Sequence, residues 1–242
     1  MATASVVGRP FNIADISGID VRSFEGVTRL ATLASMSERI DHLTSNTTSK
    51  SAISEQRDRD QDEQQWLITS PYTTKVHQLD LSTIDLQNQI LAIALQILTP
   101  VSEDYAVLPY PETFQWESVM DVVRTLAKLS GVRWTRREFY VVEFRSRLKA
   151  DIDRALLYKL DEMSHAEAAV SGGLLKYWYG KPDAERRNLA TCLWRSKEDA
   201  IKGGQGPWHK QARGIIPRMY EHISVKGFQL VIDDDIAVFH FE

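Results

Sequence analysis

The chain of 242 residues lacks the features that mark several large classes of protein. It has one cysteine, which cannot form an intrachain disulfide, and it does not start with the basic and apolar segments of a secretory signal. Its longest apolar stretch, residues 90–98, is interrupted by Gln96 and is shorter than the roughly 18–20 residues of a membrane helix. Lysine and arginine total 29 against 33 aspartates and glutamates, without a basic run. We therefore expect a cytoplasmic protein that has neither nucleic acid nor a membrane as a partner.

Several catalytic motifs are also missing. The sequence contains no Gly-x-Ser-x-Gly, no dinucleotide-binding glycine fingerprint and no Cys-x-x-Cys, which argues against the commonest hydrolases, dehydrogenases and thiol redox proteins. None of the six histidines has the spacing of a metal-binding motif. The one cysteine, Cys192, lies in the apolar run 189–194 and is interpreted as a core residue. The sequence therefore predicts neither a metal nor a cofactor.

Aromatic residues are scarce at the start of the chain. Only Phe11 and Phe24 of the 22 lie in residues 1–65, which end in the charged stretch 54–63. Such a segment buries too little apolar area to offset the entropy of ordering. We therefore predict a mostly disordered tail or linker over residues 1–65, with a weak amphipathic helix over residues 27–43.

Folded structure is expected from Trp66 onward. Residues 75–81 have the pattern of a strand, and Ser82 or Thr83 can cap a helix that ends at Pro100. Apolar positions spaced by three and four residues predict a second helix over 116–129, with Gly131 after its end. Residues 66–130 are thus interpreted as a strand-helix-helix extension packed on the core.

Residues 131–242 show the clearest order of elements. β-Branched and aromatic residues predict a strand over 138–145, and a helix follows over 151–170. Two strands, a short helix broken by Gly203-Gly204 and restarted at Pro207, and a last strand complete the chain. These three strands are expected at 174–179, 188–195 and 228–232. The order β-α-β-β-α-β predicts an α+β domain with the ferredoxin-like sheet.

This part of the chain resembles a known superfamily. The strand 139–144, the helix before Gly172-Gly173 and the segment 191–200 are similar to the dimeric α+β barrels that include the antibiotic-biosynthesis monooxygenases. Their third strand often ends in Trp-x-Ser-x-Glu-Ala, and this chain has Trp194-Arg195-Ser196-Lys197-Glu198-Asp199-Ala200, with one residue inserted before the alanine. Residues 66–242 also resemble a family of uncharacterised fungal proteins through Gly-Pro-Trp-His at 206–209, a likeness that implies no activity.

The superfamily resemblance carries expectations about assembly. Its members pair two four-stranded sheets across a homodimer interface and keep a pocket between each sheet and its own helices. The resemblance thus implies either a homodimer or a segment of the same chain that covers the sheet, and residues 66–130 are the candidate for such a segment.

Two residues are candidate catalytic groups. His209 lies in the first turn of the predicted helix that starts at Pro207, where burial and the helix N-terminus favour a neutral imidazole that acts as a general base. Arg195 ends the third strand, where its guanidinium can stabilise a developing negative charge. A structural histidine and a solvated arginine are the alternative interpretations.

Aromatic residues from several elements surround the predicted sheet and are candidates for binding a flat or apolar ligand. We expect a cofactor-independent enzyme of the oxygenase, decarboxylase or isomerase type, acting on an apolar or aromatic metabolite. The alternative is a non-catalytic ligand-binding or protein-interaction module of the same fold, in which these aromatics are core residues. The expected substrate-binding residues are Trp194, Trp208, Tyr140, Tyr177 and Tyr220.

Overall fold

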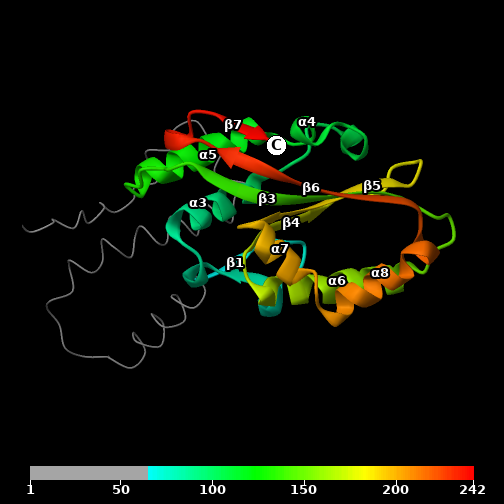
Figure 1. Cartoon of the computed structure of the whole chain (residues 1–242). Helices are drawn as coiled ribbons and strands as arrows, with labels where there is room; N and C mark the ends of the chain where they lie inside the picture. The colour runs from blue at the N-terminus through cyan, green and yellow to red at the C-terminus, as the bar shows by residue number, and fades with distance from the viewer. Residues whose placement is uncertain (1–64) are drawn as a thin grey trace, which may run out of the picture.

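The computed structural model describes residues 65–242. The tail predicted over residues 1–65, except its last residue, and the helix predicted over 27–43 lie outside the described residues. The described chain forms a central sheet with helices on both sides (Figure 1).

Five antiparallel strands form the central sheet, in the order β4-β5-β3-β6-β7. The first four of these have the strand order of a ferredoxin-like sheet, so the predicted fold class is confirmed. The last strand, β7, was not expected from the sequence and adds an edge next to β6. The strands are β3 (Arg137–Leu148), β4 (Leu174–Tyr179), β5 (Arg187–Trp194), β6 (Tyr220–Ile232) and β7 (Phe239–Phe241).

Three helices of the body lie on one face of the sheet. Asp153 starts the longest of them by accepting a hydrogen bond from the Leu156 backbone N–H, and Gly172, with a φ of 86°, follows its end. Ser196 caps the next helix, and Pro207 opens the last, which leads directly into β6. They are α6 (Arg154–Ser171), α7 (Lys197–Gly203) and α8 (Pro207–Met219).

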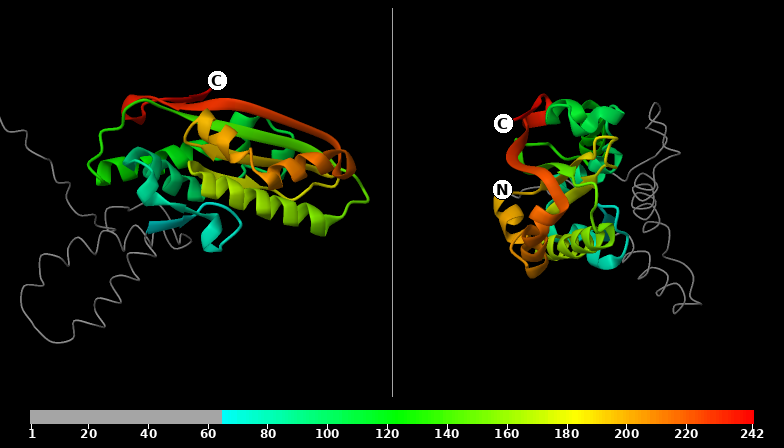
Figure 2. Two further views of the ribbon diagram at one scale, coloured as in Figure 1. Left: turned by 60° about the horizontal axis from the view of Figure 1, so that its bottom comes forward. Right: turned by 90° about the vertical axis from the view of Figure 1, so that its right-hand side faces the viewer.

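Residues 66–130 cover the opposite face of the sheet (Figure 2). Their two longer helices pack on each other, and apolar residues of both join one core with the sheet. A small hairpin precedes them and lies beside α6. The elements are β1 (Trp66–Ile68), β2 (Gln78–Asp80), α3 (Leu86–Ala94), α4 (Tyr110–Thr113) and α5 (Trp116–Leu129). The short 3-10 turns are η3 (Lys75–His77), η4 (Leu81–Thr83), η5 (Leu95–Ile97), η6 (Glu103–Ala106) and η7 (Asp234–Ile236).

The two faces of the sheet are covered to different extents. Along β3, Phe139 and Val141 point toward α3 and α5 and are at most 1% exposed. Tyr140 and Val142, on the opposite face because strand side chains alternate, are only half-buried. Around these residues of β3 the sheet is thus fully covered on the side of α3 and α5 and only partly covered on the side of α6 and α8.

The elements differ from the sequence prediction at a few places. The helix over 116–129 and the strand over 174–179 have the predicted bounds. The strand expected over 75–81 is a 3-10 turn followed by only three strand residues. The strand expected over 228–232 begins earlier, at Tyr220, because residues 220–227 pair with β3 although most of their exposed positions are polar or glycine.

Candidate functional site

A carboxylate between α6 and the sheet is the centre of the candidate site. Asp161 Oδ2 accepts a hydrogen bond of 2.5 Å from the Tyr72 hydroxyl, and Oδ1 accepts one of 2.6 Å from the Tyr177 hydroxyl. Tyr72 comes from the segment between β1 and η3, Asp161 from α6 and Tyr177 from β4. Three segments that are distant in the sequence thus meet at one carboxyl group.

Burial governs the protonation of this carboxyl group. Burial raises the pKa of Asp161 above its usual value, although the two tyrosine hydrogen bonds and the charge of His209 oppose the shift. The pKa of Tyr177 is raised by burial first and then by the charge of Asp161. The tyrosines therefore remain donors, and Asp161 is the group that exchanges a proton most readily.

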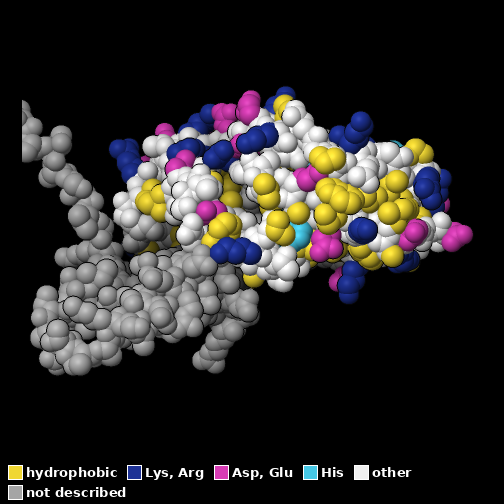
Figure 3. Space-filling model, turned by 90° about the horizontal axis from the view of Figure 1, so that it is seen from below, with side chains coloured by type: hydrophobic (Ala, Val, Ile, Leu, Met, Phe, Trp, Pro, Cys, Tyr) yellow, Lys and Arg dark blue, Asp and Glu magenta, His cyan; other side chains and the backbone are white. Residues whose placement is uncertain are grey.

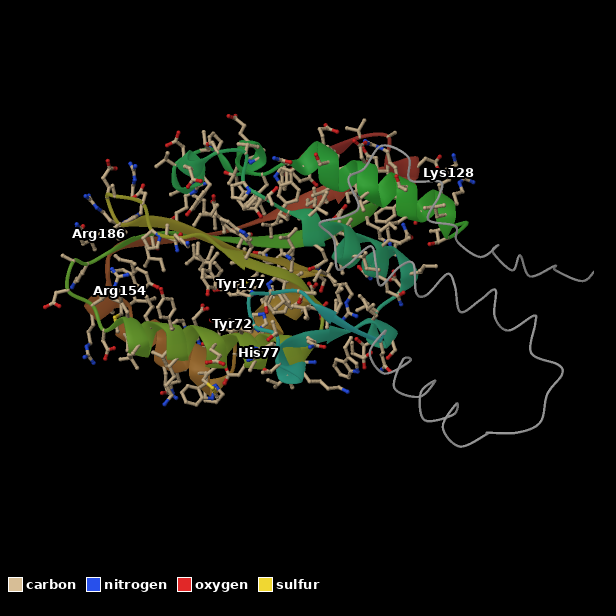
Figure 4. The ribbon with its side chains drawn as sticks, turned by 180° about the vertical axis from the view of Figure 1, so that it is seen from behind. Tyr72, His77, Lys128, Arg154, Tyr177 and Arg186 are labelled. Carbon is tan, nitrogen blue, oxygen red and sulfur yellow. The ribbon has the colours of Figure 1, made fainter. Side chains whose placement is uncertain are left out.

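Two histidines lie beside Tyr72. The Nδ1 atoms of His77 and His165 are 2.9 Å apart, and Tyr72 packs on both rings. Burial lowers the pKa of His165 to about 3, with further contributions from the charges of His77 and His209. Figure 4 shows Tyr72, His77 and Tyr177 close together between the hairpin, the sheet and α6. The neutral pair His77–His165 thus connects the segment before α3 to α6.

The predicted catalytic histidine lies on the same side of the sheet. His209 Nδ1 is 3.0 Å from Glu167 Oε2, and the Glu167 carboxylate also accepts hydrogen bonds from the backbone N–H groups of Trp208 and His209. Burial acts to raise the pKa of Glu167, but these hydrogen bonds hold it below its usual value. Glu167 thus fixes the start of α8 and orients His209, whose charge acts on Asp161.

Arg195 and Trp194 are held at the end of β5. The Arg195 guanidinium makes two hydrogen bonds to Asp199, of 2.7 and 2.9 Å. Trp194 is 3% exposed and lies against Gly203, where an added Cβ would be 2.2 Å from its ring. The structure therefore surrounds the predicted ligand-binding tryptophan with protein and gives the predicted anion-binding arginine a carboxylate partner.

The other predicted aromatic residues surround the sheet face near Asp161. Tyr140 lies across Gly227, where an added Cβ would be 1.9 Å from its hydroxyl oxygen. Burial and the charge of Asp161 raise the pKa of Tyr220 to about 12. Trp208 is half-buried at the start of α8. Among the predicted residues, Tyr177 contacts Asp161 directly, while Tyr220 and His209 interact with it through charge.

The sheet face around these residues is apolar and accessible. Val142, Ala190 and Cys192 are half-buried, and Val225 on the neighbouring strand is 56% exposed. Burial raises the pKa of the Cys192 thiol, which keeps it protonated. Apolar side chains also gather on the outer side of α6 and α8 (Figure 3). Tyr158 of α6 is 53% exposed. This face thus presents apolar side chains near a titratable carboxyl group.

The sequence did not single out Asp161, Tyr72, His77 or His165 as site residues. One signal was present, because Asp161 and His165 are four residues apart and therefore share a face of α6. Tyr72 and His77 carried no such signal, since they reach the site from a segment more than 80 residues away.

Neither a metal centre nor a membrane helix is found in the part of the chain that the structure describes. Within residues 65–242, no three His, Cys, Asp or Glu side chains are grouped so that they could hold a metal ion. The same residues contain no helix of the length and hydropathy needed to cross a membrane.

Comparison with known proteins identifies the family. A family model described as "PB2B2.08-like" matches residues 68–242. The chain belongs to this family. Its relative, the UPF0643 protein PB2B2.08 of Schizosaccharomyces pombe, is 37% identical over 174 residues, which are 69% of this chain and 79% of the relative.

Several solved structures align with 38–39% of this chain at low sequence identity. A putative antibiotic biosynthesis monooxygenase from Nitrosomonas europaea is 15% identical, with a TM-score of 0.33, over 38% of this chain and 86% of its own. The cofactor-independent oxygenase SnoaB from Streptomyces nogalater is 11% identical, with a TM-score of 0.32, over 38% of this chain and 91% of its own. A dimeric ferredoxin-like protein of unknown function from Thermobifida fusca is 13% identical, with a TM-score of 0.32, over 39% of this chain and 93% of its own.

Proposed function

We propose that this chain is an enzyme that moves a proton on a small apolar or aromatic molecule held against the half-open face of the sheet. The observation that supports the proposal is the Asp161 carboxyl group, whose pKa is raised by burial and whose two oxygens are oriented by Tyr72 and Tyr177. A carboxyl group with a raised pKa and fixed oxygens is a candidate for general acid-base catalysis.

The proposed reaction begins with loss of a proton from an activated carbon of the substrate. The C–H bond breaks, an O–H bond forms on Asp161, and the electron pair stays on the substrate as an enolate. His209, oriented by Glu167, is the second group proposed to hold or return the proton. Arg195 was predicted to stabilise the anion. Because its guanidinium already forms an ion pair with Asp199, we propose that it stabilises the enolate while it stays paired with that carboxylate.

Three reaction types share a proton transfer at this carbon: isomerisation and oxygenation begin with loss of the proton, whereas decarboxylation forms the carbanion by loss of CO2 and ends with gain of a proton. Isomerisation, decarboxylation and oxygenation of an enolisable compound all pass through a stabilised carbanion. No group beyond the chain's own residues is needed for the proton transfer itself. A cytoplasmic setting in fungal secondary metabolism agrees with the resemblance and with the single cysteine, and it forms part of the proposal.

Exchange of substrate hydrogen for deuterium tests the proposal. The purified full chain would be extracted with organic solvent, and a retained compound would be identified by mass spectrometry. That compound, together with a panel of aryl methyl ketones and cyclic 1,3-diketones, would be incubated with the chain in D2O and followed by proton NMR. We expect Asp161→Asn to slow exchange by about 100-fold or more, the usual contribution of a general base.

The matched control is Glu162→Gln, which changes an exposed carboxylate on the same helix. It should exchange at the rate of the unchanged chain. Equal exchange rates in Asp161→Asn and the unchanged chain would remove Asp161 from the mechanism. Near-ultraviolet circular dichroism of both variants checks that the fold is retained.

A non-catalytic ligand-binding or protein-interaction module is the second proposal. It is favoured by the hydrogen bonds of Asp161, because a carboxyl group with a tyrosine on each oxygen is already satisfied as a structural element. Retention of a compound without hydrogen exchange, in the unchanged chain and in Asp161→Asn alike, would support binding over catalysis.

A homodimer is the remaining expectation about partners. The apolar sheet face opposite α6 is already covered by α3 and α5 of the same chain. A dimer would therefore have to use another surface, and we propose that the extension takes the place of a partner's sheet. Light scattering at micromolar concentration should give the mass of a monomer, and the mass of a dimer would contradict this proposal.

A further inference from the structure

A pocket lies on the face of the sheet opposite to Asp161. It has a volume of about 480 Å³ and lies between the segment leading into α4 and strands β3, β6 and β7. Its lining includes Leu108, Tyr110, Glu143, Lys226, Phe228 and Phe241. Side chains from four segments thus enclose a space large enough for a small organic molecule.

Aromatic rings form the apolar wall of this pocket. The centroid of the Tyr110 ring is 4.9 Å from the ring centroid of Phe228 and 5.7 Å from that of Phe241, and both contacts are edge-to-face. The Tyr110 hydroxyl is paired with Thr191 at 2.7 Å, which fixes its ring. A flat ligand in the pocket would therefore meet rings that are already rigidly placed.

The buried charges of the pocket neutralise each other. Glu143 is 5% exposed and accepts a hydrogen bond of 2.6 Å from Arg145. Arg145 also donates to the backbone carbonyls of Ala106 and Leu108, which hold the segment before α4 over the pocket. This pair thus builds the wall and leaves no net charge for a ligand.

Lys226 is the charge that remains available. It pairs directly opposite Glu143 in the ladder of β3 and β6 and is exposed at the pocket. Within residues 65–242 no salt bridge to its ammonium group is found, and Arg145 is the partner of Glu143. The Glu242 carboxylate also lines the pocket and lies 3.8 Å from His240 Nε2. A ligand would therefore meet an apolar aromatic wall with the Lys226 ammonium group and the Glu242 carboxylate at its rim.

We propose that this pocket binds small aromatic molecules that carry an anionic group such as a carboxylate. The aromatic body packs on Tyr110, Phe228 and Phe241, and the anion lies at the Lys226 ammonium group. The site is separate from Asp161 and does not depend on the function proposed for that face.

A pair of matched probes tests both halves of the proposal. 1-Anilinonaphthalene-8-sulfonate has an aromatic body and an anion, and N-phenyl-1-naphthylamine has the same body without the anion. Isothermal titration calorimetry with the full chain should show the anionic probe bound more tightly. Lys226→Met should weaken the anionic probe by about tenfold and leave the neutral probe unchanged, because a charge-assisted contact is lost. Lys210→Met, on exposed α8, is the control and should change neither affinity.

A second pair of variants locates the binding. Val107 lines this pocket and is 49% exposed, so Val107→Trp fills the pocket without disturbing the core. Val225→Trp makes the same kind of change at an equally accessible position on the opposite sheet face. We expect Val107→Trp to abolish binding of the anionic probe, and Val225→Trp and Asp161→Asn to leave it unchanged.

Three results would overturn the inference. The first is absence of binding of the anionic probe at millimolar concentration. The second is equal affinity of both probes together with no effect of Lys226→Met. The third is loss of binding in Val225→Trp but not in Val107→Trp, which would place the probe on the Asp161 face instead.

Discussion

The two faces of the central sheet differ in how they are covered and in what they contain. The face under α3 and α5 forms the main core, in which Phe139, Val141 and Leu230 are at most 1% exposed. The face under α6 and α8 carries half-buried apolar residues around the part-buried hydrogen bonds of Asp161. Helices α3 and α5 of the extension therefore supply the main apolar core, whereas the segment before them supplies the polar residues Tyr72 and His77 to the other face.

The largest effect is expected from truncating the same residue type on the two faces of β3. Phe139→Ala on the sealed face should lower the free energy of unfolding by about 3–5 kcal/mol, because it leaves a cavity among fully buried neighbours. Phe144→Ala on the partly open face should lower it by about 1 kcal/mol, since that side chain is only half-buried. Urea denaturation of both variants measures the difference, and equal losses would contradict the contrast between the faces.

The second-largest difference in stability loss is expected between variants that remove one partner of an ion pair. Arg145→Met leaves Glu143 buried without its partner and frees the carbonyls of Ala106 and Leu108, so we expect a loss of about 3 kcal/mol. Arg195→Met, at the more exposed pair with Asp199, should lose about 0–1 kcal/mol. The midpoints of chemical denaturation of the two variants measure these losses. A larger loss of stability in Arg195→Met than in Arg145→Met would contradict the prediction.

Acidification should destabilise the polar face. The folded state keeps His165 neutral by lowering its pKa to about 3, below the usual 6.5, so this contribution is complete above pH 6.5 and is lost as the pH falls. Between pH 6.5 and pH 5 the free energy of unfolding should drop by about 2 kcal/mol on this account.

His165→Gln should remove this part of the pH dependence, whereas His222→Gln, which changes an exposed histidine, should retain it. Denaturation curves at both pH values compare the three proteins. A slope in His165→Gln as steep as that of the unchanged chain would show that other groups cause the acid sensitivity.

The smallest effect concerns the protonation of Asp161. The Tyr72 hydrogen bond favours the carboxylate, so Tyr72→Phe should raise the pKa of Asp161 further. A carbon-13 NMR titration of labelled aspartate measures the shift directly. Tyr158→Phe, on the exposed side of α6, serves as the control and should leave that titration unchanged.

The sequence predicted local structure best where one face of an element is fully buried. The helix 116–129 buries Val119, Met120 and Val123 completely, and its apolar spacing gave both of its ends. Residues 220–227 of β6 were not predicted as strand, because they include several exposed polar residues and a glycine. Periodicity is informative only where burial selects the residues.

Prediction from the sequence has the same limit for the residues of the candidate site. Tyr177 and His209 were selected from the sequence, because an aromatic strand and a helix start have local signals. Asp161 and Tyr72 have no local signal that separates them from other polar residues, since their meeting depends on a hydrogen bond across 89 positions of the chain.

The sequence by itself determined the β-α-β-β-α-β order of the body and the ferredoxin-like class, because hydrophobic periods, caps and glycine stops act over a few residues. Only the tertiary structure decided which sheet face α3 and α5 cover, that Asp161 lies between two tyrosines, and that a pocket forms beside Lys226. Those features depend on contacts between distant segments, whose geometry is set by packing of the whole chain and not by any local pattern.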